Sequence, residues 1–155
     1  MGDVEIVNLG DKVESELERL IEGLTLSYHR LTERADALHG PRGVTTGIRA
    51  LILLLEAAGP LTMSEIAAAR SVSRQFIQRL CQSLAEGGWI EARPNPRHRR
   101  SPLIALSEKG KAEAGRIRTL EAPLLAQLAA EVPAQDLARA ADVLARLAAR
   151  LDAEA

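Results

Sequence analysis

Apolar side chains recur every three or four positions in two segments near the start of the chain, which is the spacing of one helix face. In the first segment the apolar positions are Leu17, Leu20, Ile21, Leu24, Leu31 and Leu38. Their spacing predicts a helix over about 11–38, which the sequence Gly40-Pro41-Arg42-Gly43 ends. The second segment predicts a helix over 46–58, which ends at Gly59-Pro60.

Capping residues predict two further helices in the middle of the chain. Thr62 and Glu65 form a capping box, in which the hydroxyl accepts the amide of residue 65 and the carboxylate reaches back to residue 62. This box predicts a short helix over 63–69. Ser73 is a typical N-cap for a longer helix over 74–86, which the pair Gly87-Gly88 ends.

The next segment has the alternation of β-strands. It predicts strands over 89–93 and 103–106, joined by a proline-containing loop that is longer than a tight hairpin turn. Beyond them, a helix is predicted from Ser107 to about residue 130, with a kink at Pro123. A last helix follows Val132-Pro133 and ends at about residue 152.

The predicted elements give a fold that is mainly α with a small two- or three-stranded β wing. Composition excludes several other classes. One cysteine rules out an internal disulfide framework, and three aromatic residues are too few for stacking along single-stranded nucleic acid. The longest apolar run, from Ala50 to Leu55, is far shorter than a membrane span, and the start of the chain lacks the pattern of a signal peptide. We therefore expect one cytoplasmic domain over 1–155, with no membrane partner.

The net charge of −1 hides a basic middle third. Residues 60–111 carry nine basic and four acidic side chains, whereas 1–59 carry six and ten, and 112–155 carry five and seven. The run from Arg93 to Arg100, RPNPRHRR, is the densest part. Clustered arginine can neutralise phosphates and release counterions. The same run is also compatible with a solvated basic loop.

Two helices joined by a tight turn, then a hairpin with a basic loop, are the parts of a winged helix-turn-helix, whose second helix lies in the major groove. On that helix Ile77, Leu80 and Leu84 share one face, which we expect to pack against Ile66 and Trp89. The side chains left outward are Arg74, Gln75, Gln78, Arg79 and Gln82. Arginine and glutamine pair in a bidentate manner with guanine and adenine edges.

Residues 61–110, LTMSEIAAARSVSRQFIQRLCQSLAEGGWIEARPNPRHRRSPLIALSEKG, resemble the core of the MarR family of bacterial transcriptional regulators. The resemblance rests on the small-residue bracing helix, on SRQFIQRLCQSL before the glycine turn, and on NPRHRRS before LIALSEKG. It implies a homodimer that binds a short palindrome in double-stranded DNA. Many members are repressors that are released by a small aromatic ligand or by oxidation.

The resemblance divides the chain into a winged helix-turn-helix at 46–110 and flanking dimerisation helices at 11–45 and 111–152. The recognition helix is expected at about 73–87 and the wing at about 89–106. Apolar stripes at both ends support dimerisation, because one small winged domain cannot cover them. Their members are Leu17, Leu20, Leu24, Leu120, Leu124, Leu128, Leu137, Leu144, Leu147 and Leu151.

The wing departs from the family pattern at one position. The family usually carries Asp, any residue and Arg, where this chain has His98-Arg99-Arg100. Arg100 takes the place of the arginine that enters the minor groove, but His98 cannot hold it by an ion pair as an aspartate would. The expected DNA-contacting residues are Ser73, Arg74, Gln75, Gln78, Arg79, Arg97, Arg99 and Arg100.

The resemblance implies a pocket for a small organic effector between the terminal helices and the winged part. The residues expected to line it are Tyr28, His29, Arg49 and Leu53. Cys81 is expected to be a packed thiol rather than a redox sensor. His29 and His39 lack the clustered partners that a zinc site needs, so we expect no metal.

The leading hypothesis is a dimeric, ligand-responsive repressor, and it competes with two others. We find no phosphate-binding loop and no nucleophile–base pair, so we expect neither an enzyme nor a cofactor. The first alternative is the dimerisation domain of a methyltransferase-type enzyme, which the chain length disfavours because no cofactor-binding sheet follows the predicted helices. The second alternative is a winged-helix module that binds protein and not DNA. Its contact face would favour aromatic anchors over arginine and glutamine.

Overall fold

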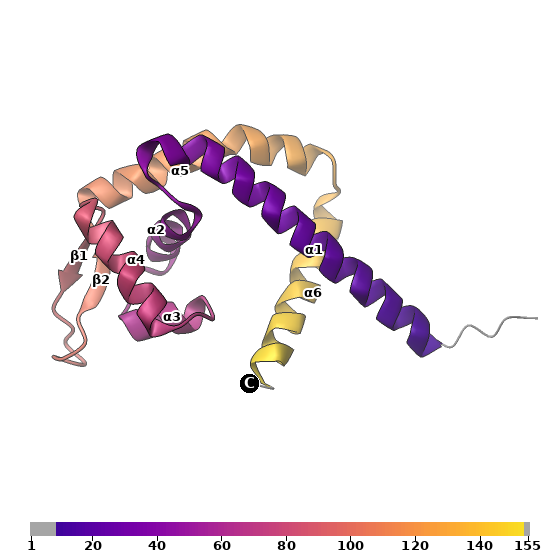
Figure 1. Cartoon of the computed structure of the whole chain (residues 1–155), viewed down its shortest axis with the longest axis horizontal. Helices are drawn as coiled ribbons and strands as arrows, with labels where there is room; N and C mark the ends of the chain where they lie inside the picture. The colour runs from indigo at the N-terminus through magenta and orange to yellow at the C-terminus, as the bar shows by residue number, and fades with distance from the viewer. Residues whose placement is uncertain (1–8, 154–155) are drawn as a thin grey trace, which may run out of the picture.

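A computed structural model describes residues 9–153; residues 1–8 and 154–155, the ends of the predicted 1–155 domain, lie outside the described part. The described chain is mainly helical with a two-stranded antiparallel wing, which confirms the predicted fold class (Figure 1). In chain order the elements are α1 (Leu9–His39), η1 (Gly40–Arg42), α2 (Thr46–Ala58), α3 (Met63–Ala69), α4 (Arg74–Glu86), β1 (Ile90–Arg93), β2 (Leu103–Leu106), α5 (Glu108–Ala130) and α6 (Ala134–Asp152).

The predicted caps form at the helices of the winged part. The Thr62 hydroxyl accepts from the Glu65 amide at 3.2 Å, and the Glu65 carboxylate accepts from the Thr62 amide at 2.7 Å. The Ser73 hydroxyl accepts from the Phe76 amide at 3.2 Å, which confirms the predicted start of α4. One boundary differs from expectation, because β1 begins at the residue after Trp89. As predicted, α5 is one helix that contains Pro123.

The core of the winged part surrounds α2. Ile52 of α2, Ile66 of α3 and Leu84 of α4 are fully buried, and Ile117 of α5 closes the same cluster. Leu80 and Trp89 are half-buried and pack against it, as the apolar face of α4 predicts. A short bridge between Leu61 and Ile104 adds a third segment beside β2. The same core therefore joins α4 to strand β2 of the wing.

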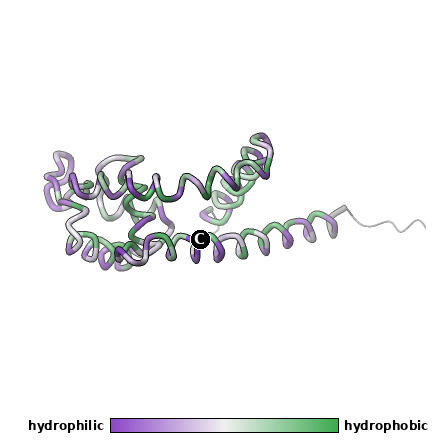
Figure 2. Tube along the Cα trace, turned by 90° about the horizontal axis from the view of Figure 1, so that it is seen from above, coloured by the Kyte–Doolittle hydropathy of each residue, from purple (hydrophilic) through white to green (hydrophobic). Residues whose placement is uncertain are grey.

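The two ends of the molecule have different characters. The wing and α4 lie at one end, whereas α1 projects beyond the other end and α6 runs away from α5 (Figure 1). Hydrophobic and hydrophilic residues alternate with the helical repeat along the projecting part of α1 (Figure 2). None of the described helices is long and apolar enough to cross a membrane.

Candidate nucleic-acid interface

The outer face of α4 carries the residues that the sequence predicts to contact DNA. Arg74, Gln75, Gln78 and Arg79 are all exposed, while Ile77, Cys81 and Leu84 on the opposite face are buried. Ser73 is exposed at the N-cap. The first two turns of the helix thus present two guanidinium and two amide groups to solvent, which are the groups that read guanine and adenine edges in a major groove.

The last turn of α4 presents a different surface. The Gln82 amide donates a hydrogen bond to the Glu86 carboxylate at 3.2 Å, and both side chains are exposed. A carboxylate here repels phosphate, so the face that suits DNA is restricted to the N-terminal half of the helix. Sequence reasoning placed Gln82 outward but overlooked Glu86, although the spacing of four residues signals such a pair.

The wing lies next to α4. Strands β1 and β2 pair antiparallel, with Ile90 opposite Leu106 and Arg93 opposite Leu103. The loop between them exposes Arg97, His98, Arg99 and Arg100. Among the described residues, none accepts a side-chain hydrogen bond or ion pair from these three arginines, whereas Arg93 is paired with Glu91 at 2.8 Å. The loop guanidinium groups are therefore available to an outside anion.

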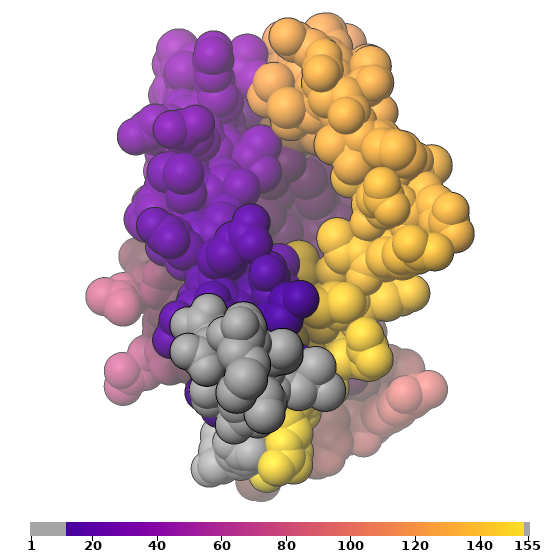
Figure 3. Space-filling model, turned by 90° about the vertical axis from the view of Figure 1, so that its right-hand side faces the viewer, coloured from indigo at the N-terminus to yellow at the C-terminus, as the bar shows by residue number. Residues whose placement is uncertain are grey.

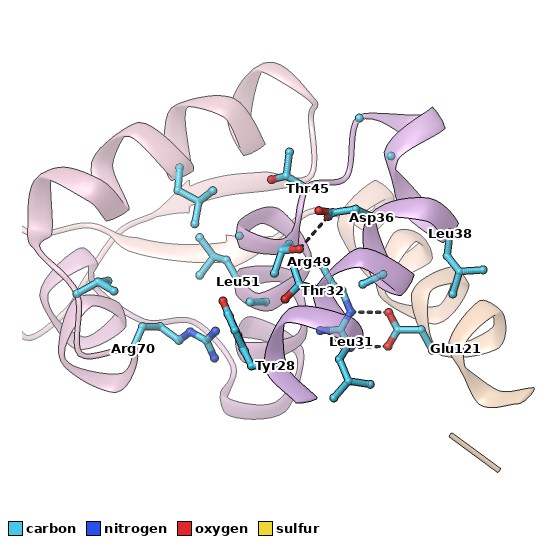
Figure 4. Close-up of a pocket in the computed structure, with 18 of the residues that line it drawn as sticks. Tyr28, Leu31, Thr32, Asp36, Leu38, Thr45, Arg49, Leu51, Arg70 and Glu121 are labelled. Atoms are coloured by element: carbon cyan, nitrogen blue, oxygen red, sulfur yellow. Dashed lines mark hydrogen bonds and ion pairs between the residues drawn. The ribbon is translucent and has the colours of Figure 1, made fainter. Parts of the chain in front are cut away.

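A cavity of about 870 Å³ lies between α1, α2, α4 and α5 (Figure 4). Tyr28 and Arg49 line it, as the sequence predicts, but His29 and Leu53 do not. His29 is exposed on α1, and Leu53 is half-buried and packs against the core. The residues of the winged part that reach the cavity include Arg70, Val72, Phe76 and Leu80. The cavity therefore borders the recognition helix directly.

A cluster of charged and polar side chains, which we call the α2–α5 charge cluster, reaches this cavity through Arg49 and Glu121. It consists of His39, Arg42, Arg49, Glu113 and Glu121. Its two glutamates and its histidine are buried, whereas its two arginines are partly exposed. The Glu121 carboxylate accepts two hydrogen bonds from the Arg49 guanidinium (Figure 4). It accepts a third from His39 Nε2 at 2.6 Å. Arg42 donates to His39 Nδ1 at 3.0 Å and to Glu113 at 3.1 Å.

The electrostatics of the charge cluster follow from its pairing. Burial tends to raise the pKa of Glu121, but the hydrogen bonds from Arg49 and His39 outweigh burial and hold that pKa below its usual value. The bond to Glu121 in turn raises the pKa of Arg49, although burial opposes it. Because Arg42 can only donate, His39 Nδ1 accepts and its Nε2–H donates to Glu121. Sequence reasoning missed this cluster, because no local pattern marks its members.

Two further predictions concern reactive groups. Cys81 is buried in the core, and burial raises the pKa of its thiol, so the nucleophilic thiolate is disfavoured. This agrees with the predicted packed thiol. Among the described residues there is no cluster of three histidine, cysteine or acidic side chains that could hold a metal ion.

The terminal helices expose apolar side chains that no described element covers. Figure 3 shows the end of the molecule that α1, the end of α5 and α6 form. The exposed apolar residues of these helices include Val13, Leu17, Ile21, Leu24, Leu31, Leu125, Leu128, Leu137 and Leu151. Within the described chain, α6 makes no extensive contact with another element. An apolar surface of this extent is typical of a protein–protein interface.

Comparison with known proteins agrees with this architecture. A model of the MarR family matches residues 46–101. An uncharacterised protein of Mycobacterium tuberculosis is 31% identical over 99 residues, which cover 64% of this chain and 68% of the relative. A solved MarR family transcription regulator, SP03579, is 28% identical with a TM-score of 0.76, covering 96% of this chain and all of that one.

A mutant of MarR from E. coli, solved in complex with operator DNA, shares the fold at 21% identity. Its TM-score is 0.73, and the match covers 85% of this chain and 95% of that one. The chain belongs to the MarR family of winged-helix transcription regulators.

Proposed function

We propose that this regulator binds double-stranded DNA sequence-specifically as a homodimer on a short palindrome, and that it represses transcription until a small organic effector releases it. The observation that carries the proposal is the arrangement of the exposed Arg74, Gln75, Gln78 and Arg79 beside a wing loop with three exposed arginines. The E. coli MarR mutant that shares this fold was solved in complex with operator DNA, which supports DNA binding as the function of the fold.

Dimerisation follows from the uncovered apolar end of the molecule. We propose that the helices within 11–45 and 111–152 pair with those of a second copy, because a twin presents the same apolar stripes in complementary order. The winged part at 46–110 then lies on each side of the pair. A two-fold axis relates the two copies of α4, so each copy meets one half of a palindrome.

The cavity supplies a place for the effector. Tyr28 and Arg49 offer a hydroxyl and a guanidinium group, and the apolar part of the lining includes Val72, Phe76 and Leu80. Because the last two belong to α4, a molecule that fills the cavity contacts the recognition helix. Such contact can change the position of α4 relative to DNA when the effector prefers one arrangement over another.

Selection from a random pool of duplexes tests the central claim. We expect the protein to enrich a palindrome whose half-site centres lie about 10 base pairs apart, since two recognition helices of a dimer meet one face of the duplex. Placed across a promoter, this site should lower expression of a reporter when the protein is present. Enrichment of a single asymmetric half-site would contradict the dimer geometry. Absence of any enriched duplex would favour the protein-binding module instead.

Substitutions on the wing and on α4 should weaken DNA binding in different ways. Arg100→Ala removes a cation that neutralises phosphate, so affinity should fall on all duplexes, and the salt slope should flatten by about 0.9 per lost contact, up to about 2 per dimer. Gln75→Ala or Gln78→Ala should cost about 1–3 kcal/mol on the selected site and little on scrambled DNA. Binding measured against salt on both duplexes checks this. If Arg100→Ala changes neither affinity nor slope, the wing does not contact DNA.

A further inference from the structure

The wing loop is an ordered double turn, and one side chain closes it. The amide of His98 donates to the carbonyl of Asn95 at 3.3 Å, and the amide of Ser101 donates to the carbonyl of His98 at 3.0 Å. Two consecutive turns therefore carry the loop from residue 95 to residue 101. The side chain of Asn95 is half-buried, unlike the exposed side chains of residues 97–100.

Both ends of the Asn95 side chain are used inside this loop. Its Oδ1 accepts from the backbone amide of Arg97 at 3.0 Å, which fixes the first turn. Its Nδ2 donates to the backbone carbonyl of Ser101 at 2.8 Å, which ties the first turn to the end of the second. One amide group thus spans six positions of the chain. The segment that it encloses carries Arg97, Arg99 and Arg100.

His98 takes part in the loop through its backbone alone. Its amide and carbonyl belong to the two turns, whereas its side chain is exposed and makes no hydrogen bond with another described residue. The loop is therefore ordered without an acid at position 98. This explains how the wing keeps a defined shape although the usual aspartate is missing.

We propose that Asn95 is a positioning residue for DNA binding: its side chain holds the arginine-bearing turns in the shape in which they meet the duplex. The inference rests on the function proposed above, because it assumes that the wing contacts DNA. Its physical basis is preorganisation. A loop that is ordered before binding does not lose its conformational freedom on binding, so less of the contact energy is lost to entropy.

The test compares three variants of the full-length protein. Asn95→Ala removes both hydrogen bonds. Asn95→Ser keeps a neutral hydroxyl that can accept from the Arg97 amide but is too short to reach the Ser101 carbonyl. Gln135→Ala, on the exposed N-terminal turn of α6, is the control for loss of a side-chain amide far from the wing. Helical spacing places Gln135 on the opposite side of α6 from Leu137, Leu144 and Leu151, and so away from the proposed dimer stripe.

Two measurements follow on each variant. Backbone order parameters of residues 97–100 in the DNA-free protein should fall from about 0.85 to below about 0.6 in Asn95→Ala, and by less in Asn95→Ser. Affinity for the selected duplex should fall at least about tenfold in Asn95→Ala, because each copy must then order its wing loop when it binds. The salt slope should stay unchanged, because every arginine remains, and the thermal midpoint should stay unchanged, because the loop lies outside the core. Gln135→Ala should change none of these quantities.

Unchanged order parameters in Asn95→Ala would overturn the proposal, because the side chain would then not organise the loop. Lower order with unchanged affinity would overturn it as well. In that second case Arg100→Ala locates the failure. If Arg100→Ala weakens binding, the wing contacts DNA and only the role of Asn95 is wrong. If Arg100→Ala has no effect either, the proposed wing contact itself is wrong.

Discussion

Replacing Leu17 and Leu137 by aspartate should convert the protein from a dimer to a monomer and abolish tight binding to a palindrome. Both side chains are exposed in the single chain, so the change leaves the core intact. In the proposed dimer each substitution places an unpaired carboxylate in an apolar interface, which costs several kcal/mol. The dissociation constant of the dimer should rise at least about a thousandfold.

The consequence for DNA follows from the loss of the second half-site contact. Two linked winged parts bind a palindrome about 10²–10⁴ times more tightly than one does. Sedimentation at micromolar concentration measures the mass, which should fall from twice 16.7 kDa to 16.7 kDa. Titration with the selected duplex measures the affinity of the same samples.

Leu26→Asp is the matched control for this experiment. Leu26 is about as exposed as Ile21 and Leu24, but helical spacing places it on the opposite side of α1 from Leu17, Ile21 and Leu24. We expect this variant to remain a dimer with unchanged DNA binding. The dimer proposal fails if the Leu17/Leu137 variant still sediments as a dimer, or if it binds the palindrome as a monomer with parental affinity.

Glu121→Ala should destabilise the protein more than any other loss of a single ion pair in the described chain. The change leaves the Arg49 guanidinium and the His39 Nε2–H without their acceptor beside the buried core. Breaking a buried pair from one side costs about 3–5 kcal/mol, and we expect the lower end because Arg49 is partly exposed. Urea unfolding at neutral pH and fixed protein concentration measures this free energy.

The pH dependence gives the same experiment a second readout. The pKa of Glu121 is lowered in the folded protein by Arg49 and His39 acting against burial, so the folded state favours the charged carboxylate. The contribution of Glu121 to stability is fully present above the ordinary glutamate pKa of about 4.3. It is lost as the pH falls through the lower pKa that Glu121 has in the folded protein. The gap in unfolding free energy between parent and Glu121→Ala should therefore narrow only in acid.

Arg118→Ala provides the control on the same helix. Arg118 donates to Glu56 at 2.7 Å, but its side chain is largely exposed, and such surface pairs contribute less than about 1 kcal/mol. We expect a small effect at neutral pH. If Glu121→Ala costs no more than Arg118→Ala, the α2–α5 charge cluster does not hold these helices together.

Much of the winged part could be predicted because its signals are local. The capping box of Thr62 and Glu65 involves residues three positions apart, and it begins α3 where the sequence predicts. The outward face of α4 follows from the helical period alone: once Ile77 and Leu84 are assigned to the core, Gln75 and Arg79 must point to solvent. The helical period alone therefore determines which side chains of α4 face solvent, and no tertiary contact is needed to predict them.

The residues that line the cavity could be predicted only in part from spacing within each helix. Tyr28 and His29 are neighbours in sequence, but adjacent helical positions point about 100° apart, and only Tyr28 reaches the cavity. On α2, Arg49 lines the cavity whereas Leu53, one turn further, packs against the core. The choice depends on how α1 and α5 lie across α2, which the spacing within each helix does not specify.

In the wing and in the charge cluster, too, the sequence predicts some features and only the tertiary structure decides the others. The arginines of the wing could be identified from the sequence. The hydrogen bonds that join the Asn95 side chain to the backbone of Arg97 and Ser101 exist only in the folded loop. In the cluster, His39 and Glu121 are 82 positions apart, and Arg42 and Glu113 are 71 apart. A glutamate in a helix has the same sequence signal whether it is solvated or buried. The buried face of a helix follows from the 3.6-residue repeat of its own apolar positions. These ion pairs, by contrast, exist only because α5 packs against the end of α1 and the start of α2.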